Sequence, residues 1–279
     1  MKTILFFTDL SIASTKAAKY AYAFAKEYGI KKIILYHTYQ LPAVSGDPVV
    51  PAIQLFDYES FNKIQKQALE NFHKHLLNEV DAEGIDTQEL CEISSLTFDI
   101  NETIQTHNVD VIIIGTNNND EIEDFLLGSD TLNIAKNSKV PVIIVPLNAT
   151  YKTIKTIVLA CDFKKDMAAS TVKHVIDFTE TTKAKLNVLH ISSENETYTP
   201  EMYEETKTFT NLFKEFHPEF YFADNNNFIK GINDFAVEKG VDIIMATSKK
   251  HSLFEKLFKR SHLKQLVFHS HTPLMVIHD

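Results

Sequence analysis

The chain has 279 residues, of which 44% are hydrophobic and 23% charged, and its formal net charge is −9. This composition is that of a globular protein, and the length is sufficient for two domains of ordinary size. The acidic balance argues against general nucleic-acid binding, and no apolar run reaches the roughly 20 residues that span a bilayer. Because residues 1–4 enter a strand-like segment without a signal peptide, we expect a cytosolic protein without a membrane partner.

The sequence contains the same series of motifs twice. Corresponding residues recur at an offset of 153 and then of 132 residues: Asp9 and Asp162, His37 and His190, Val109 and Val241, Pro141 and Pro273. A repeat of this length is a whole domain. We therefore expect domain 1 at residues 1–148 and domain 2 at residues 152–279. Since the linker between them is so short, the domains should pack together as a pseudo-dimer.

In the first copy, apolar runs alternate with segments of helical periodicity. Chain order gives an apolar strand at residues 3–8, a helix capped at Ser11 or Ser14, and a second strand at 31–37. The elements expected after these are a helix at 61–80, an outer strand at 87–93, a helix at 99–107, and strands at 111–115 and 140–145.

The second copy follows the same order. Its expected strands are at residues 154–160, 184–191, 219–223, 242–246 and 273–277. Continuous apolar runs that alternate with helices indicate parallel strands covered on both faces. The predicted fold class is therefore α/β.

Polar and glycine residues stand where several of the predicted strands end. In an open parallel sheet, ligands bind beyond the carboxyl ends of the strands, which here are Thr8-Asp9, His37-Thr38 and Gly115-Thr116. A glycine after a buried strand lets the backbone approach a ligand or adopt a positive φ. Gly128-Ser129 directly precedes a helical pattern, and free N–H groups at a helix N-terminus suit a phosphate.

The spacing of Gly115, two residues, Asn118, nine residues and Gly128-Ser129 resembles the ATP-binding signature of the universal stress protein family. That signature has a glycine at the position of Asn118. Residues 4–11, 35–38 and 140–146 resemble the first, second and last strands of the family. Both copies match from end to end, so the chain resembles a tandem universal stress protein.

The resemblance implies two tandem Rossmann-like domains of the adenine nucleotide alpha hydrolase-like type. Each would be a five-stranded parallel sheet in the order 3-2-1-4-5, flanked by helices and paired with the other through its last strand. The resemblance also implies that members with the full signature bind ATP, whereas members without it often do not.

Carrying the family's nucleotide site over to the first copy gives a defined set of contacts. The residues implied are Phe7, Thr8 and Asp9 at the base, Thr38 beside it, Ile114 and Gly115 near the sugar, and Asn117, Asn118, Gly128, Ser129, Asp130 and Thr131 at the phosphates. Asn118 adds bulk where the family has glycine. Asp130 brings negative charge to the phosphate end of the site. A bound nucleotide should therefore need Mg²⁺ between its phosphates and the Asp130 carboxylate.

The second copy departs further from the signature. Thr247, Lys250 and Arg260 stand at the positions of Gly115, Asn118 and Gly128. A different anionic ligand would have to bind here through side chains, with these candidate residues: Asp162, Lys249, Lys250, Arg260 and Ser261. The alternatives are a solvated basic helix face, or a basic face that meets the acidic copy of another subunit in a homodimer.

The sequence gives little support for catalysis or metal binding. No catalytic motif and no metal site with ligand spacing is present, and His73 and His75 do not share a helix face. We expect His37 and His190 to be semi-buried, and the two cysteines, Cys91 and Cys161, to be buried free thiols. No catalytic residue is therefore predicted, although slow ATP hydrolysis, with Asp9 or Asp130 as base, stays an alternative.

The hypothesis is a regulatory or sensing protein with a degenerate ATP site in domain 1, an adenine nucleotide as partner, and no nucleic acid. The alternative is a scaffold that binds no nucleotide and acts through protein contacts or a small anion at domain 2.

Overall fold

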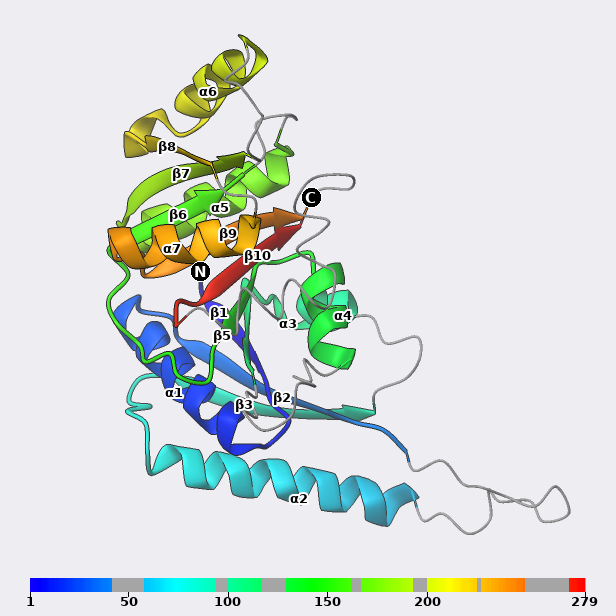
Figure 1. Ribbon diagram of the computed structural model, residues 1–279. Helices are drawn as coiled ribbons and strands as arrows, with labels where there is room; N and C mark the ends of the chain where they lie inside the picture. Colours follow the sequence, from blue (N-terminus) through cyan, green and yellow to red (C-terminus); the bar gives the residue numbers. More distant parts are fainter. Residues whose placement is uncertain are drawn as a thin grey trace, which may run out of the picture.

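The computed structural model describes residues 1–41, 58–93, 100–116, 129–161, 167–192, 200–224, 227–248 and 271–278. Its strands form one ten-stranded sheet in the order β3-β2-β1-β4-β5-β10-β9-β6-β7-β8 (Figure 1). The strands are β1 (Thr3–Phe7), β2 (Lys32–Tyr39), β3 (Asp86–Ile93), β4 (Val111–Gly115), β5 (Val142–Val145), β6 (Thr156–Ala160), β7 (Lys185–Ser192), β8 (Glu219–Asp224), β9 (Ile243–Ser248) and β10 (Leu274–His278). The helices are α1 (Ile12–Glu27), α2 (Tyr58–Leu77), α3 (Ile100–His107), α4 (Ser129–Asn137), α5 (Ala169–Thr182), α6 (Pro200–Leu212) and α7 (Phe228–Lys239), with a short 3-10 turn η2 (Lys214–Phe216).

Each half of the sheet has the predicted strand order. From its outer edge inward, the first half reads β3-β2-β1-β4-β5 and the second half reads β8-β7-β6-β9-β10, which is 3-2-1-4-5 in both cases. The α/β fold class, the parallel half-sheets and the repeated topology are thus confirmed. The domain limits themselves, at residues 148 and 152, stay a prediction.

The two halves join through their last strands. β5 and β10 pair antiparallel with Ile143 opposite Met275, whereas every other strand pair in the described sheet is parallel. The strands of the second half therefore run opposite to those of the first. As a result, the carboxyl ends of the two half-sheets lie at opposite ends of the strands.

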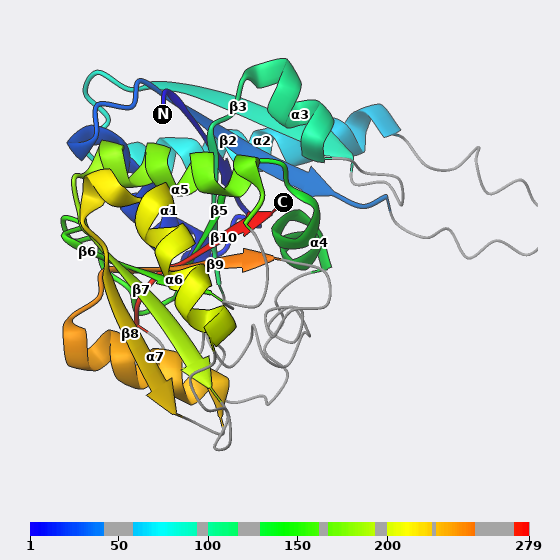
Figure 2. The ribbon, with the colours of Figure 1, turned by 90° about the horizontal axis from the view of Figure 1, so that it is seen from above.

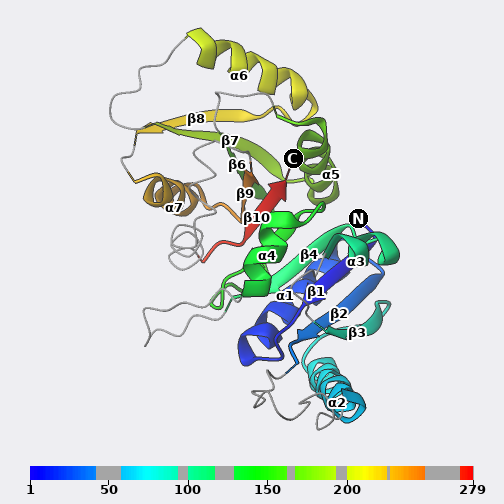
Figure 3. The ribbon, with the colours of Figure 1, turned by 90° about the vertical axis from the view of Figure 1, so that its right-hand side faces the viewer.

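The sheet is covered on both faces because its central strands are apolar throughout. β1, β4 and β5 are buried along almost their whole length. One core cluster joins one face to α1, α2 and α5, and the other joins the opposite face to α3, α4 and α7. In Figure 2, α4 lies across β5 and β10 from α1 and α5. The outermost helices, α2 and α6, lie beside the edge strands β3 and β8 at opposite ends of the molecule (Figure 3).

An aromatic cluster fastens the halves to each other. Phe24 of α1 and Phe178 of α5 stack with ring centroids 6.0 Å apart. Tyr151, in the segment that links the halves, packs edge-on against Tyr20 at 5.1 Å and donates a hydrogen bond of 2.6 Å to the Glu27 carboxylate. The expected packing of the two copies against each other is therefore present.

The burial of each cysteine depends on where its strand lies in the sheet. Cys161 is buried as expected, but Cys91 is only half-buried, because β3 forms an edge of the sheet. Both are free thiols. Within the described ranges, no helix has the length and hydropathy needed to cross a membrane.

Candidate functional site

The carboxyl ends of β1, β2 and β4 meet at one place. Phe7 lies opposite Tyr36 on one neighbouring strand and opposite Ile114 on the other. The Phe7 and Tyr36 rings make an edge contact with centroids 6.1 Å apart. Thr38 is two residues beyond Tyr36 on the same strand, so Phe7, Thr38 and Ile114 lie at the same edge of the sheet.

The predicted contacts divide between the two faces of the sheet. Phe7 and Ile114 belong to the cluster covered by α3 and α4. Because successive side chains of a strand point to opposite faces, Thr8 and Gly115 turn toward α1 instead. A ligand on the α4 side would thus contact the side chains of Phe7 and Ile114 but only the backbone of their neighbours.

Thr8 accepts hydrogen bonds from two neighbouring residues of the protein. It is fully buried, its hydroxyl oxygen accepts a hydrogen bond of 2.9 Å from the Leu10 N–H, and its carbonyl accepts one of 2.9 Å from His37 Nδ1. Leu10 has a φ of 64°, a left-handed conformation that is uncommon for such a residue. Thr8 therefore shapes the tight turn between β1 and α1.

Asp9 is the exposed acidic group of this turn. One of its carboxylate oxygens, Oδ1, accepts hydrogen bonds from the Ser11 N–H at 3.0 Å and from the Ser14 hydroxyl at 2.6 Å. Partial burial raises the pKa of Asp9, but these hydrogen bonds outweigh burial and lower the pKa below its ordinary value. The group is thus a carboxylate at neutral pH. Its other oxygen has no hydrogen bond within the described residues.

The first turn of α1 has a defined cap. The Ser11 side chain accepts a hydrogen bond of 3.2 Å from the Ser14 N–H, which makes Ser11 the N-cap, one of the two candidates that the sequence offered. Asp9 and Ser11 thereby fix the start of the helix beside the strand ends.

Gly115 serves packing, and its predicted contact with a ligand stays a prediction. Its φ is not among the positive values of the chain, and a Cβ at this position would lie 2.7 Å from the Ala17 Cβ and 3.2 Å from the Ala13 carbonyl oxygen. The glycine is needed because α1 passes directly over β4. In the second half, Thr247 is buried at the equivalent place on β9.

The phosphate end of the predicted site is described only in part. α4 begins at Ser129, so Ser129, Asp130 and Thr131 form its first turn and the helix starts where the sequence expected it. The remaining predicted residues of both sites lie outside the described ranges: Asn117, Asn118, Gly128, Asp162, Lys249, Lys250, Arg260 and Ser261.

His37 and His190 are more deeply buried than the semi-buried positions expected from the sequence. His37 and His190 are both buried and both approach the backbone carbonyl that precedes the motif aspartate, of Thr8 and of Cys161 respectively. His73 lies against the Glu89 carboxylate, and the described residues contain no group of side chains suited to a metal ion.

One cavity escaped the sequence reasoning because it forms between the two halves. It has a volume of about 380 Å³ and is lined by Asp110 of the first half and by His174 and Asp177 of α5. The Nδ1 atom of His174 is buried there without a hydrogen-bond partner in the described structure. The related cavity, at Asp242 of the second half, is lined by Tyr20 of α1. No local motif marks such residues, since they are adjacent only after the halves pair.

Comparisons with known proteins agree with this architecture. The model of the universal stress protein family matches residues 1–146. The universal stress protein MJ0577 of Methanocaldococcus jannaschii is 27% identical over 156 residues, which cover 52% of this chain and 94% of the relative. A universal stress protein structure from Archaeoglobus fulgidus shares the fold over 99% of this chain and 98% of its own, with a TM-score of 0.73 at 18% identity.

A second structure supports the fold of the full length. The protein PA1789 from Pseudomonas aeruginosa, whose function is described as unknown, covers 100% of this chain and 92% of its own, with a TM-score of 0.60 at 15% identity. The family model spans more than half of the 279 residues, and both halves have the same strand order. The chain belongs to the universal stress protein family.

Proposed function

We propose that this chain is a regulatory or sensing protein whose first half binds an adenine nucleotide beyond the ends of β1, β2 and β4. The observation that carries the proposal is the position of Asp9. It lies, exposed and ionised, at the end of β1, which neighbours β4 where the strand order of the half-sheet reverses. Ligands of open parallel sheets bind at such switch points.

The base and the ribose would occupy the α4 side of this edge. Phe7 and Ile114 offer apolar surface at the strand ends, and the Asp9 oxygen that has no hydrogen bond within the described residues is an acceptor for a hydroxyl or amino group. The phosphates would point to the start of α4, where Asp130 in its first turn makes Mg²⁺ the expected companion of ATP.

Calorimetric titration with ATP, in the presence and absence of Mg²⁺, tests the proposal directly. Binding must also raise the unfolding temperature, by the equivalent of about 2.7 kcal/mol when ATP is present at 100 times its dissociation constant. If millimolar ATP produces no heat and no stabilisation, nucleotide binding is contradicted.

Variants locate the site. Asp9→Asn keeps an oxygen that can accept from Ser11 and Ser14 but removes the charge, so we expect weaker ATP binding with little loss of stability. Ser11→Ala removes the helix cap and is the control, with lower stability and nearly unchanged affinity. Gly128→Asp should abolish binding and Arg260→Ala should leave it intact; the opposite result would place the site in the second half.

The alternative is a scaffold without nucleotide, and one observation favours it. Thr8 and Gly115, two residues of the implied site, are committed to the turn and to helix packing. Such a scaffold would act through protein contacts, or through a small anion at residues 249–261 of the second half. The cytosolic address and the absence of catalytic turnover stay predictions from the sequence.

A further inference from the structure

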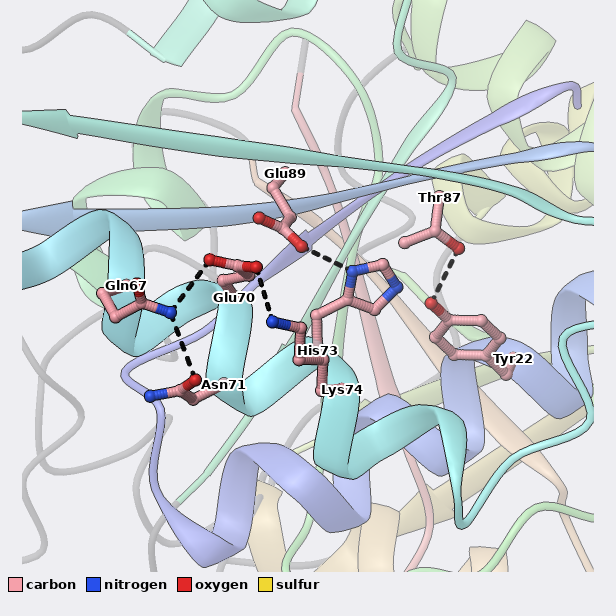
Figure 4. Close-up of polar contacts among 8 residues, drawn as sticks. All are labelled: Tyr22, Gln67, Glu70, Asn71, His73, Lys74, Thr87 and Glu89. Carbon is pink, nitrogen blue, oxygen red and sulfur yellow. Dashed lines mark hydrogen bonds and ion pairs between the residues drawn. The ribbon is translucent and has the colours of Figure 1, made fainter. Parts of the chain in front are cut away.

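Tyr20 of α1 is a buried tyrosine that lines the cavity beside Asp242. Only 3% of its surface is exposed, and its ring packs against the rings of Phe24 and Tyr151. Its hydroxyl has no hydrogen-bond partner within the described residues. By contrast, the hydroxyl of Tyr22 on the same helix lies 2.9 Å from the Thr87 hydroxyl (Figure 4). Because buried polar groups are nearly always hydrogen-bonded, a partner for the Tyr20 hydroxyl is expected in the cavity that it lines.

The cavity combines a buried wall with an exposed polar rim. Its volume is about 250 Å³. Tyr20, Val241 and Pro273 of the wall are buried, and Asp242 is half-buried. The rim consists of exposed residues: Asn148, Thr150, Lys152 and His271. Pockets for drug-sized ligands measure roughly 300 to 1,000 Å³, so this one suits a smaller molecule.

Asp242 is the acidic group of the wall. One of its carboxylate oxygens, Oδ2, accepts hydrogen bonds from the Lys155 and Thr156 N–H groups at 2.8 and 3.0 Å. The other oxygen, Oδ1, has no hydrogen bond and the carboxylate no ion pair within the described residues. Burial raises the pKa of Tyr20, and Tyr28, Asp242 and Glu27 raise it further. The Asp242 carboxylate therefore lies close enough to act electrostatically on the Tyr20 hydroxyl that shares its cavity.

The first half supplies a cation at the corresponding place. Asp110 accepts two backbone hydrogen bonds at the start of β1, as Asp242 does at the start of β6. Lys173 of α5, which corresponds to Tyr20 at the offset of 153 residues, lines the cavity of Asp110. Asp177 and, more weakly, Asp110 raise the pKa of Lys173, whereas burial lowers it. Asp110 thus has an ammonium group of the protein near it, while Tyr20 offers Asp242 no positive charge.

The charges of the cavity select a ligand with two ionised groups. A positive group suits Asp242 in the wall, and a negative group suits Lys152 at the rim, which has no ion pair within the described residues. An α-amino acid carries an ammonium and a carboxylate group on the same carbon atom. The flexible stem of Lys152 lets its own ammonium group follow the ligand carboxylate. An apolar side chain would pack against Val241 and Pro273.

We propose that the cavity between Tyr20 and Asp242 binds a small apolar α-amino acid as a zwitterion. The ammonium group of the ligand donates hydrogen bonds to Asp242 Oδ1 and to the Tyr20 hydroxyl, and its carboxylate approaches Lys152 and His271. None of these residues belongs to the proposed nucleotide site, so the inference does not depend on nucleotide binding.

Calorimetric titration of the full chain with valine tests the proposal. The controls are isobutylamine, which lacks the carboxylate of valine, and isovalerate, which lacks its ammonium group. We expect saturable binding of valine and at least about tenfold weaker binding of each control, because each control loses one charge-assisted contact. Absence of binding at tens of millimolar valine, or equal binding of all three compounds, would overturn the proposal.

Tyr20→Phe tests the role of the hydroxyl. The substitution keeps the ring contacts with Phe24 and Tyr151, so it should weaken valine binding about tenfold without lowering the unfolding temperature. Tyr22→Phe is the control, because its hydroxyl does not line the cavity, and should leave valine binding unchanged. If Tyr20→Phe binds valine as tightly as the unmodified protein, the site is wrongly assigned.

Two further variants test the charges. Asp242→Asn should abolish valine binding, whereas Asp110→Asn, at the corresponding residue of the first half, should leave it intact. Lys152→Ala should weaken the binding of valine but not of isobutylamine. Stronger binding of both compounds to Lys152→Ala would identify Lys152 as the counter-ion of Asp242 and would overturn the proposal. If Asp242→Asn fails to fold, Tyr20→Phe and Lys152→Ala still decide the question.

Discussion

The Nδ1 atom of His37 donates a hydrogen bond of 2.9 Å to the backbone carbonyl of Thr8. The second half repeats the contact between His190 and the carbonyl of Cys161, at 3.3 Å. In both halves the imidazole of the second strand thus holds the end of the first strand, directly before the motif aspartate. The histidine that the sequence repeats is a positioning residue for the strand end.

Replacing His37 by alanine should therefore destabilise the protein. The buried Thr8 carbonyl loses its side-chain donor, and we expect the free energy of unfolding to fall by about 1–3 kcal/mol. Urea denaturation monitored by circular dichroism measures the change. His75→Ala on α2, whose side chain is exposed, is the matched control and should change stability by less than about 0.5 kcal/mol. Equal losses in both variants would refute the role of the His37 contact.

Gly115→Ala tests the close approach of α1 to β4. The new methyl group would meet the Ala17 Cβ at 2.7 Å, so the helix must shift, and we expect a loss of about 1–3 kcal/mol in the free energy of unfolding. Ala17→Gly in the same chain removes the opposing methyl group and should restore part of that loss, although a glycine in a helix costs about 1 kcal/mol itself. Strictly additive effects of the two substitutions would contradict direct contact.

His174, in the cavity between the halves, should make the free energy of unfolding depend on pH in the mildly acidic range. Burial, and then Lys173, lower the pKa of His174 below 6.5, while Asp177 acts in the opposite direction. The unfolded chain then binds the proton more readily than the folded one. Stability is fully present above pH 6.5 and is lost as the pH falls from 6.5 through the lowered value of the folded protein.

His174→Gln removes this titration and should flatten the pH dependence of the free energy of unfolding in that window. The carboxyl groups that share the cavity, among them Asp110 and Asp177, are present in both proteins. Urea denaturation at a series of pH values gives the comparison. His75→Gln, at an exposed position, should leave the slope unchanged; a slope that survives in His174→Gln would refute the assignment.

The linking segment is fastened by Tyr151. Tyr151→Phe keeps the ring contact with Tyr20 but removes the hydrogen bond to Glu27, and we expect a loss of about 1 kcal/mol because the pair is partly exposed to solvent. Tyr151→Ala removes the ring contact as well and should cost about 3 kcal/mol. Differential scanning calorimetry measures both. If the phenylalanine variant loses as much as the alanine variant, the hydrogen bond and not the ring is the main attachment.

The repeated fold was predictable because its signals are local or periodic. Continuous apolar strands such as β4 indicated a sheet covered on both faces, and the repeated offset indicated two copies with one topology. Even the cap at Ser11 follows from the residue type before a helical pattern. These features depend on neighbours close in sequence.

The contacts of individual site residues were harder to predict from the sequence. The sequence did not reveal that Gly115 lets α1 pass close to β4, or that the Thr8 hydroxyl accepts a hydrogen bond from Leu10. His174 and Tyr20 became notable only through the packing of the halves. Such roles depend on residues distant in sequence, which spacing alone does not reveal.

The antiparallel ladder between β5 and β10 has a consequence for assembly. Ile143 and Met275 pair although 132 residues separate them in sequence. Because pairing them closes a long loop at an entropic cost, the ladder should form after the separate half-sheets. Until then each half exposes an unpaired strand. The same ladder can form between β5 of one molecule and β10 of another, so refolding at high concentration should yield domain-swapped dimers that keep the β5–β10 ladder.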